Sequence, residues 1–345
     1  MLKTVIFGME GVIIDDIPRH TGTAIQSLQK GQYCAVPYVL DLINNLYEQG
    51  MKLILTSSFP VFIMEAVMDF LHIRNYFAGY VSDTQVLRPK PAPDIFLEAA
   101  KQGNAAPLEC IVIEASCYGV TAAEAAGITS IGYSNPNSGE ERLTQAAILV
   151  EGFDEIDYAF INQVYLHDHM LPATILTTER LILRELAQED IDRLCILSRK
   201  PGVREYVTGI SDDVALEKAK HEAYIKNIYH FYGYGLWGIF TLGEQLLIGR
   251  AGIEYRRIHQ RDIYELGYFI DPDYQGMGYA AECVRAILTY AFYRLEIPVV
   301  TAIISKDNLP SQRLAEKVGM SCSGQLTYHG QLCYTYELCR QTFHS

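Results

Sequence analysis

A glycine-containing loop at residues 273–282 has the spacing in this 345-residue chain that most directly suggests chemistry. It reads Asp-Tyr-Gln-Gly-Met-Gly-Tyr-Ala-Ala-Glu, after an apolar run, Tyr264 to Ile270, and before a helix-like segment, Ala280 to Tyr293. Gly276 and Gly278 let the backbone come close to a ligand. The first amides of a helix are unpaired and stand at the positive end of its dipole, which suits a pyrophosphate. The order of strand, glycine turn and helix therefore predicts an anion-binding loop.

The loop has the form Gln275-x-x-Gly278-x-Ala280, which resembles the acyl-CoA loop (Arg/Gln-x-x-Gly-x-Gly/Ala) of the GNAT acetyltransferases. The resemblance covers roughly residues 175–340 and is closest to the branch that acetylates ribosomal-protein N-termini. Further segments follow that branch in order: Thr178 to Arg184, the helix start at Asp190, Trp237-Gly238-Ile239, Leu247-Ile248-Gly249, Glu265 to Tyr268, Asn308-x-x-Ser311 and Glu316 to Met320. Several ordered matches are more specific than one loop, and they imply a GNAT α/β acyltransferase fold.

The resemblance implies a site for acetyl-CoA as cosubstrate and no metal. The pantetheine arm is expected on free backbone groups of the strand that ends at Phe269 and Ile270, with Asn308 close by. The pyrophosphate is expected on the loop formed by Gln275, Gly276, Met277, Gly278, Tyr279 and Ala280.

Three residues are candidates for catalysis in this half. Glu265 stands where relatives place a glutamate that acts as general base, but a strand glutamate paired with an arginine is an equal alternative. Ser311 or Asn308 is expected to hydrogen-bond the departing thiolate, because the tyrosine that many relatives use is missing from 314–316. Helix capping by Asn308, with Pro310 after it, would explain the same residues.

An aromatic-rich stretch at 224–237 is expected to form the acceptor pocket, with Tyr232, Tyr234 and Trp237 in its wall. Tyrosines can line a pocket for a cationic or aromatic amine. Core packing is the alternative, and it suits Trp237 best.

Strands alternate with helices in the first half, which predicts a parallel sheet covered on both faces. The expected strands are residues 2–7, 52–56, 110–113 and 130–133, and a helix is expected from Val39 to Gln49. Ligands of such sheets lie beyond the carboxyl ends of the strands.

Those strand ends carry four segments that resemble the motifs of haloacid dehalogenase-like (HAD) hydrolases, which implies a HAD-like Rossmannoid domain. The segments are Phe7 to Val12, Thr56-Ser57-Ser58, Lys90 to Phe96 and Glu114 to Gly127. The cap is reduced, because only about twenty residues, Asp16 to Val36, stand where relatives insert a cap domain.

The first and fourth motifs depart from the family. Gly8 replaces the aspartate nucleophile, Glu10 replaces the general acid/base aspartate, and Glu114-Ala115 replaces a pair whose aspartate holds Mg²⁺. Neither glycine nor alanine supplies a nucleophile or the hard oxygen ligand that magnesium needs. Hydrolase activity is therefore expected to be absent.

The anion-holding residues Thr56, Ser57 and Lys90 are retained. They favour either a leftover site for a phosphorylated ligand or a structural ion pair of Lys90 with Glu10 or Glu114. The ion pair is the preferred interpretation, because structural pairs imitate functional ones.

The composition excludes several other classes. Residues 1–170 carry 9 Lys and Arg against 20 Asp and Glu, and residues 171–345 carry 19 against 21, so nucleic-acid binding has no electrostatic support. The basic residues Arg256, Arg257 and Arg261 are expected in a solvated loop, with a contact to the CoA 3′-phosphate or to a partner as the alternative. No membrane span or secretion signal is visible, and eight cysteines without metal spacing suggest reduced thiols of a cytoplasmic protein. His167, Asp168 and His169 are expected to be solvated, not metal-binding.

The expected organisation is a HAD-like domain at 1–157, a linker at 158–175 and a GNAT domain at 176–345. The expected function is acetyl-CoA-dependent N-acetylation of a primary amine, on a small molecule or a protein N-terminus, with a HAD-like domain of structural or ligand-sensing role. A bifunctional acetyltransferase and phosphatase, or a non-enzymatic CoA-responsive binding module, are the alternatives. The acceptor and the oligomeric state stay open.

Overall fold

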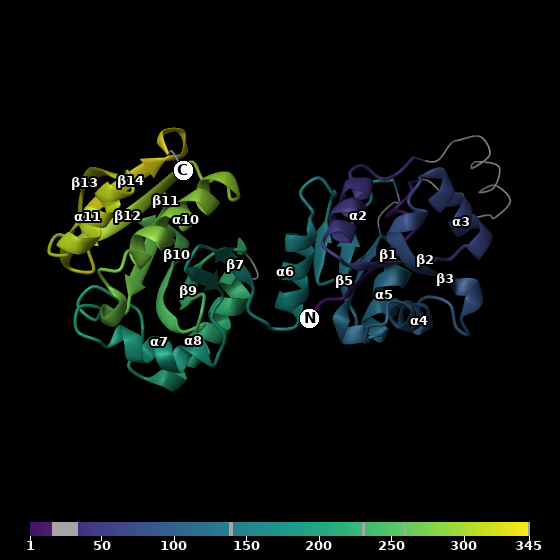
Figure 1. Ribbon diagram of the computed structural model, residues 1–345, viewed down its shortest axis with the longest axis horizontal. Coiled ribbons are helices and arrows are strands. Elements are labelled where there is room, and N and C mark those ends of the chain that lie inside the picture. Colours follow the sequence, from purple (N-terminus) through teal and green to yellow (C-terminus); the bar gives the residue numbers. More distant parts are fainter. Residues whose placement is uncertain (16–33, 138–140, 230–231, 259, 344–345) are drawn as a thin grey trace. The chain divides into compact units, whose positions relative to one another are not determined.

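The computed structural model describes residues 1–15, 34–137, 141–229, 232–258 and 260–343, so most of the expected small cap lies outside the described residues. The chain divides into two compact units, Met1–Met170 and Leu171–Ser345 (Figure 1). Helix α6 (Tyr158–Asp168) buries Ile161 and Tyr165 in the core of the first unit. The segment expected as a linker is therefore split, with its helix built into the first unit.

The first unit contains a six-stranded sheet in which all neighbouring strands are parallel. Its strand order is β3-β2-β1-β4-β5-β6, with the bounds β1 Thr4–Gly8, β2 Lys52–Ser57, β3 Phe77–Ser82, β4 Cys110–Glu114, β5 Thr129–Tyr133 and β6 Ile148–Val150. The parallel sheet predicted from the sequence is confirmed.

Helices cover both faces of this sheet. Phe7 and Leu55 pack with α2 (Val39–Glu48), α3 (Val61–Phe70) and α6 in one hydrophobic core. Their neighbours along the strands, Ile6 and Ile54, pack with α4 (Asp94–Gln102) and α5 (Cys117–Ala125) in another. Alternate strand residues point to opposite faces, so strands that are apolar throughout require helices on both sides.

The second unit contains an eight-stranded mixed sheet. Its order is β13-β14-β12-β11-β10-β9-β8-β7, with the bounds β7 Thr174–Thr177, β8 Leu181–Arg184, β9 Leu236–Thr241, β10 Leu247–Ile258, β11 Arg261–Ile270, β12 Val299–Ser305, β13 Ser321–Tyr328 and β14 Gln331–Cys339. Neighbouring strands are antiparallel except β11 and β12, which are parallel.

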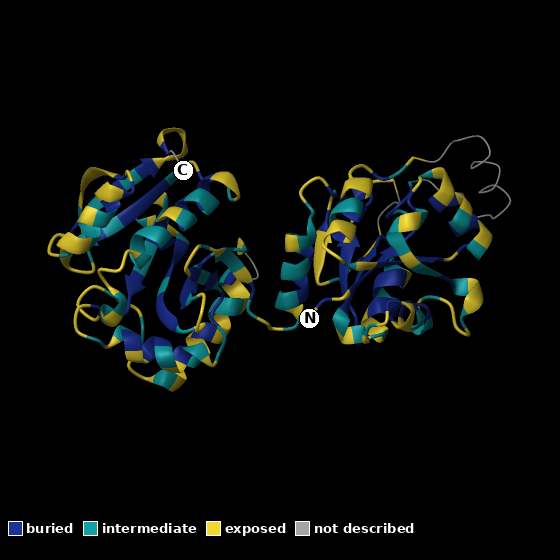
Figure 2. Ribbon diagram, viewed as in Figure 1, coloured by how far each residue is buried: buried dark blue, intermediate teal, exposed yellow. Residues whose placement is uncertain are grey.

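Two groups of helices cover this second sheet. Helix α7 (Asp190–Ser198) packs on Phe240 and Phe269, and α8 (Val214–Tyr224) follows it. Helix α10 (Tyr279–Tyr293) packs on the alternate residues, such as Ile239 and Ile270, and α11 (Leu309–Lys317) joins this core through Ala315. Figure 2 shows that central strands of both sheets, such as β1, β4 and β9, are largely buried.

The strands β11 and β12 diverge. They are paired at one register position, Glu265 with Thr301, whereas β10 and β11 are paired at ten consecutive positions from Gly249–Ile270 to Ile258–Arg261. Beyond Glu265 the β12 side of β11 therefore faces an opening instead of a sheet partner.

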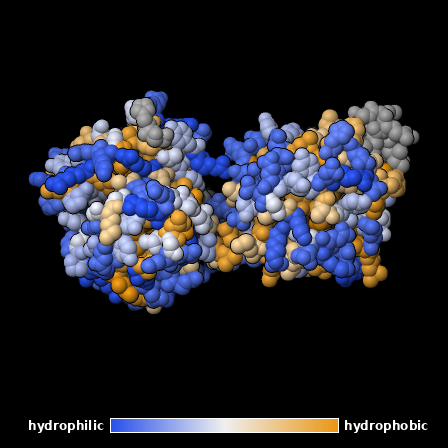
Figure 3. All heavy atoms as spheres, in the orientation of Figure 1, coloured by the Kyte–Doolittle hydropathy of each residue, from blue (hydrophilic) through white to orange (hydrophobic). Residues whose placement is uncertain are grey.

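Hydrophilic residues cover much of the face of both units that is visible in Figure 3. No described helix is both long and apolar enough to cross a lipid bilayer.

Candidate functional site

A cleft of about 630 Å³ occupies the opening between β11 and β12. It continues to the loop before α10 and to the start of α11, and the segment 202–208 after α7 also borders it. All of the expected cosubstrate-binding and catalytic residues except Met277 line this cleft; they are Glu265, Phe269, Ile270, Gln275, Gly276, Gly278, Tyr279, Ala280, Asn308 and Ser311.

The loop before α10 depends on its two glycines. Gly276 and Gly278 have φ angles of +76° and +84°, a region that residues with a Cβ rarely adopt. A Cβ added at Gly276 would meet no atom within 4 Å, so the space beside this residue is open. The loop can therefore receive a ligand against its main chain.

Arg180 holds the loop from one side. Its Nη1 donates to the carbonyl of Met277 at 3.1 Å, its Nε donates to Glu282 at 2.7 Å, and its guanidinium lies 4.5 Å from the centre of the Tyr279 ring. Thr178 Oγ1 donates to the same Glu282 carboxylate at 2.6 Å. The opening strand region expected from the sequence thus fixes the start of α10.

The cleft also exposes the β11 backbone groups on which the pantetheine arm is expected. Backbone groups of β11 face it where β12 has diverged, and the hydroxyl of Tyr268 is buried there without a hydrogen-bond partner among the described residues. An unsatisfied buried hydroxyl is costly unless a ligand or water completes it. The Gln275 side chain donates to the Ile270 carbonyl at 2.9 Å and so shapes the turn.

Glu265 lies on the cleft wall with 15% of its side chain exposed. Its Oε2 is 2.7 Å from Nε of Arg256 in an ion pair, but this oxygen makes no hydrogen bond within the described chain. Burial raises the pKa of Glu265, Arg256 lowers it, and Glu254 raises it again, with a net increase. The Glu265 carboxylate is therefore paired with an arginine, and its pKa is raised, which is the direction that suits a general base.

Asn308 and Ser311 meet at the start of α11. The Asn308 side chain accepts a hydrogen bond from the Ser311 amide at 3.2 Å, which is the capping contact expected as the alternative role. Both residues line the cleft, as does Tyr268, whose pKa is raised by burial.

The expected acceptor aromatics lie elsewhere. Trp237 is fully buried in the core, where its ring packs edge-on against Tyr290. Tyr232 and Tyr234 pack against each other, and Tyr234 packs against Tyr264. None of the three expected residues lines the cleft, because strand β9 turns Trp237 inward and the two tyrosines gather in their own ring cluster.

Among the cleft residues that sequence reasoning missed are Arg250 and Glu254 on β10 and Tyr328 on β13. The expectation that Arg256, Arg257 and Arg261 lie in a loop is wrong, because the first two are within β10 and the third begins β11. Arg256 bridges Glu254 and Glu265. The available signal was the period-two spacing of charged residues along one long strand.

At the strand ends of the first unit, Glu10 occupies the hydrogen-bond donors that the HAD resemblance assigns to phosphate. Its Oε1 accepts from the Ser57 hydroxyl at 2.8 Å and from the Ser58 amide at 2.9 Å. Thr56 donates instead to the Phe7 carbonyl at 3.1 Å. Burial raises the pKa of Glu10, although Lys90 and Ser57 oppose the shift.

Lys90 and Glu114 form a buried ion pair beside Glu10. The Nζ atom of Lys90 lies 2.5 Å from Glu114, and the two side chains are 7% and 2% exposed. Burial lowers the pKa of Lys90, but Glu114 and Glu10 outweigh it, so the pKa is above its usual value. Glu114 also accepts from the amides of Ala115 and Ser116.

Mg²⁺, which the HAD resemblance implies, does not fit these residues. Gly8 and Ala115 bring no oxygen ligand from their side chains, and the carboxylates of Glu10 and Glu114 are held by Ser57 and Lys90. Among the described residues, no group of three or more His, Cys, Asp or Glu side chains could hold a metal ion.

His169 and Asp168 both make hydrogen bonds within the first unit. His169 Nδ1 is 2.8 Å from the Tyr165 carbonyl, and Asp168 accepts from Thr129 at 2.6 Å.

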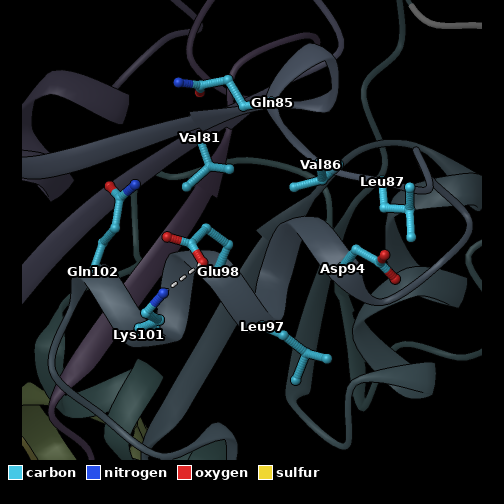
Figure 4. A pocket seen from close by; sticks show the side chains of 9 residues that line it. All are labelled: Val81, Gln85, Val86, Leu87, Asp94, Leu97, Glu98, Lys101 and Gln102. Atoms are coloured by element: carbon cyan, nitrogen blue, oxygen red, sulfur yellow. Dashed lines mark hydrogen bonds and ion pairs between the residues drawn. The ribbon is translucent and has the colours of Figure 1, made fainter.

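A separate hollow of about 510 Å³ lies beside α4 in the first unit (Figure 4). Its wall includes the exposed Leu87, and the lining residues Lys101 and Glu98 form an ion pair along α4 at 3.4 Å. None of the residues described at the strand ends of the first unit lines this hollow; they are Glu10, Thr56, Ser57, Lys90 and Glu114.

The mixed sheet that opens beside a glycine loop defines an acyl-CoA-binding fold, and the parallel sheet with its strand-end cluster defines a HAD-like fold. In agreement, the family model for the acetyltransferase (GNAT) domain matches residues 180–321, and that for haloacid dehalogenase-like hydrolases matches residues 5–133. The chain belongs to the GNAT acetyltransferases through its second unit, which is fused to a HAD-like domain.

Individual relatives match one half or the other. The chain is 30% identical over 167 residues to the uncharacterized protein YkkB of Bacillus subtilis (strain 168), covering 48% of this chain and 95% of that protein. It is 27% identical over 150 residues to the uncharacterized N-acetyltransferase YnaD of the same organism, covering 43% and 84%. It is 39% identical over 69 residues to fructose-1-phosphate phosphatase YqaB of Escherichia coli (strain K12), covering 20% and 37%.

Proposed function

We propose that the second unit is an acetyl-CoA-dependent N-acetyltransferase that acts on a primary amine of a small molecule or a protein N-terminus. One observation carries the proposal: β11 and β12 part directly after Glu265, and the resulting cleft ends at the loop 275–280. The similarity to a protein called an N-acetyltransferase supports the same class of reaction.

Each part of the cleft has a role in this proposal. Acetyl-CoA supplies the acyl group as a thioester. The amides of Gly276 to Ala280 hold the pyrophosphate, and backbone groups of Phe269 and Ile270 hold the pantetheine arm. Fixing both reactants in one cleft supplies much of the rate by proximity.

Proton transfer is assigned to Glu265. Its carboxylate takes a proton from the acceptor ammonium, and the neutral nitrogen then bonds to the acyl carbon as the bond from that carbon to sulfur breaks. The second proton that the nitrogen loses ends on the departing sulfur. The departing sulfur accepts a hydrogen bond from Ser311, whose helix is oriented by Asn308. The raised pKa of Glu265 and its place on the cleft wall support this role.

We also propose that the first unit has lost hydrolase activity and has a structural or ligand-sensing role. Gly8 cannot accept a phosphoryl group, and Glu10 fills the donors of Ser57 and Ser58. The eight free cysteines suit the reducing cytoplasm, which is the compartment we propose.

A thiol-release assay tests both proposals together. The full-length protein is incubated with acetyl-CoA and a panel of amines and N-terminal peptides, and phosphate release from sugar phosphates is measured with Mg²⁺ in parallel. Amine-dependent thiol release without phosphate release is expected. Thermal stabilisation by acetyl-CoA without thiol release from any amine would favour the binding module, and phosphate release would favour the bifunctional enzyme.

A further inference from the structure

Arg256 lies between two carboxylates that face each other across neighbouring strands. Glu254 on β10 and Glu265 on β11 are register partners, so their side chains leave the same face of the sheet at adjacent positions. Nη2 of Arg256 is 2.7 Å from Glu254, and Nε is 2.7 Å from Glu265. One guanidinium therefore serves both acids.

Tyrosines complete the surroundings of this cluster. Nη1 of Arg256 donates to the Tyr328 hydroxyl at 3.2 Å, and the Tyr224 hydroxyl donates to Glu254 at 2.8 Å. Arg256, Glu254, Glu265 and Tyr328 all line the cleft. The cluster thus borders the space in which the acceptor would lie.

We propose that Arg256 is a positioning residue for acyl transfer, which fixes the Glu265 carboxylate on the cleft wall and offsets its repulsion by the neighbouring Glu254. This inference rests on the proposed function. Arg256 itself touches neither reactant in the proposal, and it acts through Glu265.

The electrostatic reason lies in the geometry of the pair. Two carboxylates at directly opposed strand positions repel each other, and without a cation they tend to share one proton. Among the described residues, the charged or titratable groups that face Glu265 are Arg256 and Glu254 from β10, Tyr328 from β13 and Cys333 from β14. Arg256 is the cation among these four.

Removal of Arg256 should raise the pKa of Glu265. Burial already raises the pKa of Glu265, and Arg256 opposes that increase. Without the guanidinium the carboxyl would stay protonated to higher pH, and a protonated carboxyl cannot accept a proton from the amine. A purely structural ion pair would change stability but leave the pH dependence of catalysis in place.

The test is the pH profile of kcat/KM for the full-length protein with the best acceptor from the amine panel. Arg256→Gln should move the acidic limb to higher pH by about one to three pH units, the range in which a neighbouring arginine alters a carboxyl. Glu254→Gln should move the limb to lower pH. The double variant Glu254→Gln/Arg256→Gln should return toward the parent, because the repelling carboxylate and its cation are both gone.

Arg257→Gln is the matched control, since Arg257 is 70% exposed and pairs only loosely with Asp262 at 3.6 Å. Its profile should equal that of the parent. The proposal is overturned if the acidic limb of the kcat/KM profile is the same in Arg256→Gln and in the parent. It is also overturned if the double variant has the same acidic limb as Arg256→Gln. If Arg256→Gln does not fold, Arg256→Lys replaces it; retention of a single positive charge should give a smaller movement in the same direction, and no movement overturns the proposal.

A second measurement does not depend on activity. Carbon-13 NMR titration of the glutamate carboxyls, with the Glu265 signal assigned by its loss in Glu265→Gln, should give a higher pKa for Glu265 in Arg256→Gln than in the parent. An equal value overturns the role of Arg256. If no amine releases thiol but the pKa differs as expected, the proposed acceptor chemistry fails while the electrostatic role of Arg256 stands.

Discussion

A Cβ atom added to Gly8 would lie 3.0 Å from the carboxyl carbon of Glu114. The same carboxyl group would be overlapped by a Cβ at Gly119. Glu114 therefore fills the space at the end of β1 where the HAD family places its nucleophile, and Lys90 holds it there.

We predict that the full-length protein releases no phosphate from a panel of sugar phosphates and an aryl phosphate in the presence of Mg²⁺. Loss of a nucleophile removes most of the rate of a covalent mechanism, and loss of metal ligands is not additive with it. Restoring Gly8→Asp and Ala115→Asp together should give no recovery and a lower melting temperature, because the new side chain at position 8 meets Glu114. Robust turnover that disappears in Lys90→Ala would contradict the loss of hydrolase activity.

Lys90→Met should destabilise the first unit strongly. Removal of one partner leaves Glu10 and Glu114 buried without their cation, which typically costs about 3–5 kcal/mol in the free energy of unfolding. Lys101→Met is the control, since Lys101 is 79% exposed and pairs with Glu98 at 3.4 Å. Calorimetry should show a lower melting temperature for the unfolding transition of the first unit. The single tryptophan, Trp237, lies in the second unit, and the melting temperature reported by its fluorescence should not change.

The loss of stability caused by Lys90→Met should depend on pH. A carboxyl whose pKa is raised in the folded state contributes most stability below its unfolded pKa and loses it as pH rises through the folded value. Burial already raises the pKa of Glu10, and removal of Lys90 raises it further. The melting temperatures of variant and parent should therefore approach each other as pH falls from 8 to 5; a constant difference would show that the charges are not the cause.

Gly278→Asp should abolish the thermal stabilisation by acetyl-CoA. The substitution puts a side chain and a negative charge where the pyrophosphate is expected, at a residue with a φ of +84°. The added Cβ atom would lie 3.4 Å from Nη2 of Arg180. Gly319→Asp carries the same charge at a φ of +94° outside the cleft, and it should keep the stabilisation. Binding to the native state alone raises the melting temperature, so an equal shift in parent and Gly278→Asp would mean that the loop is not the binding site.

Glu265→Gln should lower kcat about 10²–10⁴-fold if Glu265 is the general base. Acetyl-CoA affinity should barely change, because backbone groups hold the cosubstrate. The parent's rate should rise with pH through a pKa above that of an ordinary glutamate, and the variant should lack this step. A modest rate drop with an unchanged profile would assign Glu265 to structure and leave proximity as the main source of rate.

Local sequence patterns were sufficient for the parts of the molecule that depend on neighbouring residues. The glycine loop follows β11 and precedes α10, and the HAD-like segments fall at the ends of β1, β2 and β4 because parallel strands bring their carboxyl ends together. Capping of α11 by Asn308 is equally local.

Contacts between distant residues were not accessible in this way. The role of Arg256 depends on the register of the β10–β11 hairpin, which brings Glu254 opposite Glu265, and a shift by one residue would turn these side chains to the other face. Tyr232 and Trp237 were expected in the acceptor pocket because aromatic side chains suit both pockets and cores, and composition alone does not separate the two.

The divergence of β11 from β12 has a consequence for how such a protein changes over evolutionary time. In the proposed function, main-chain groups of β11 make the opening for the acyl donor, whereas the rest of the cleft is shaped by side chains such as Tyr206 and Tyr328. Mutations in those side chains would then alter which amine is accepted and leave the donor site intact. On this proposal, donor use and acceptor choice can change separately in evolution.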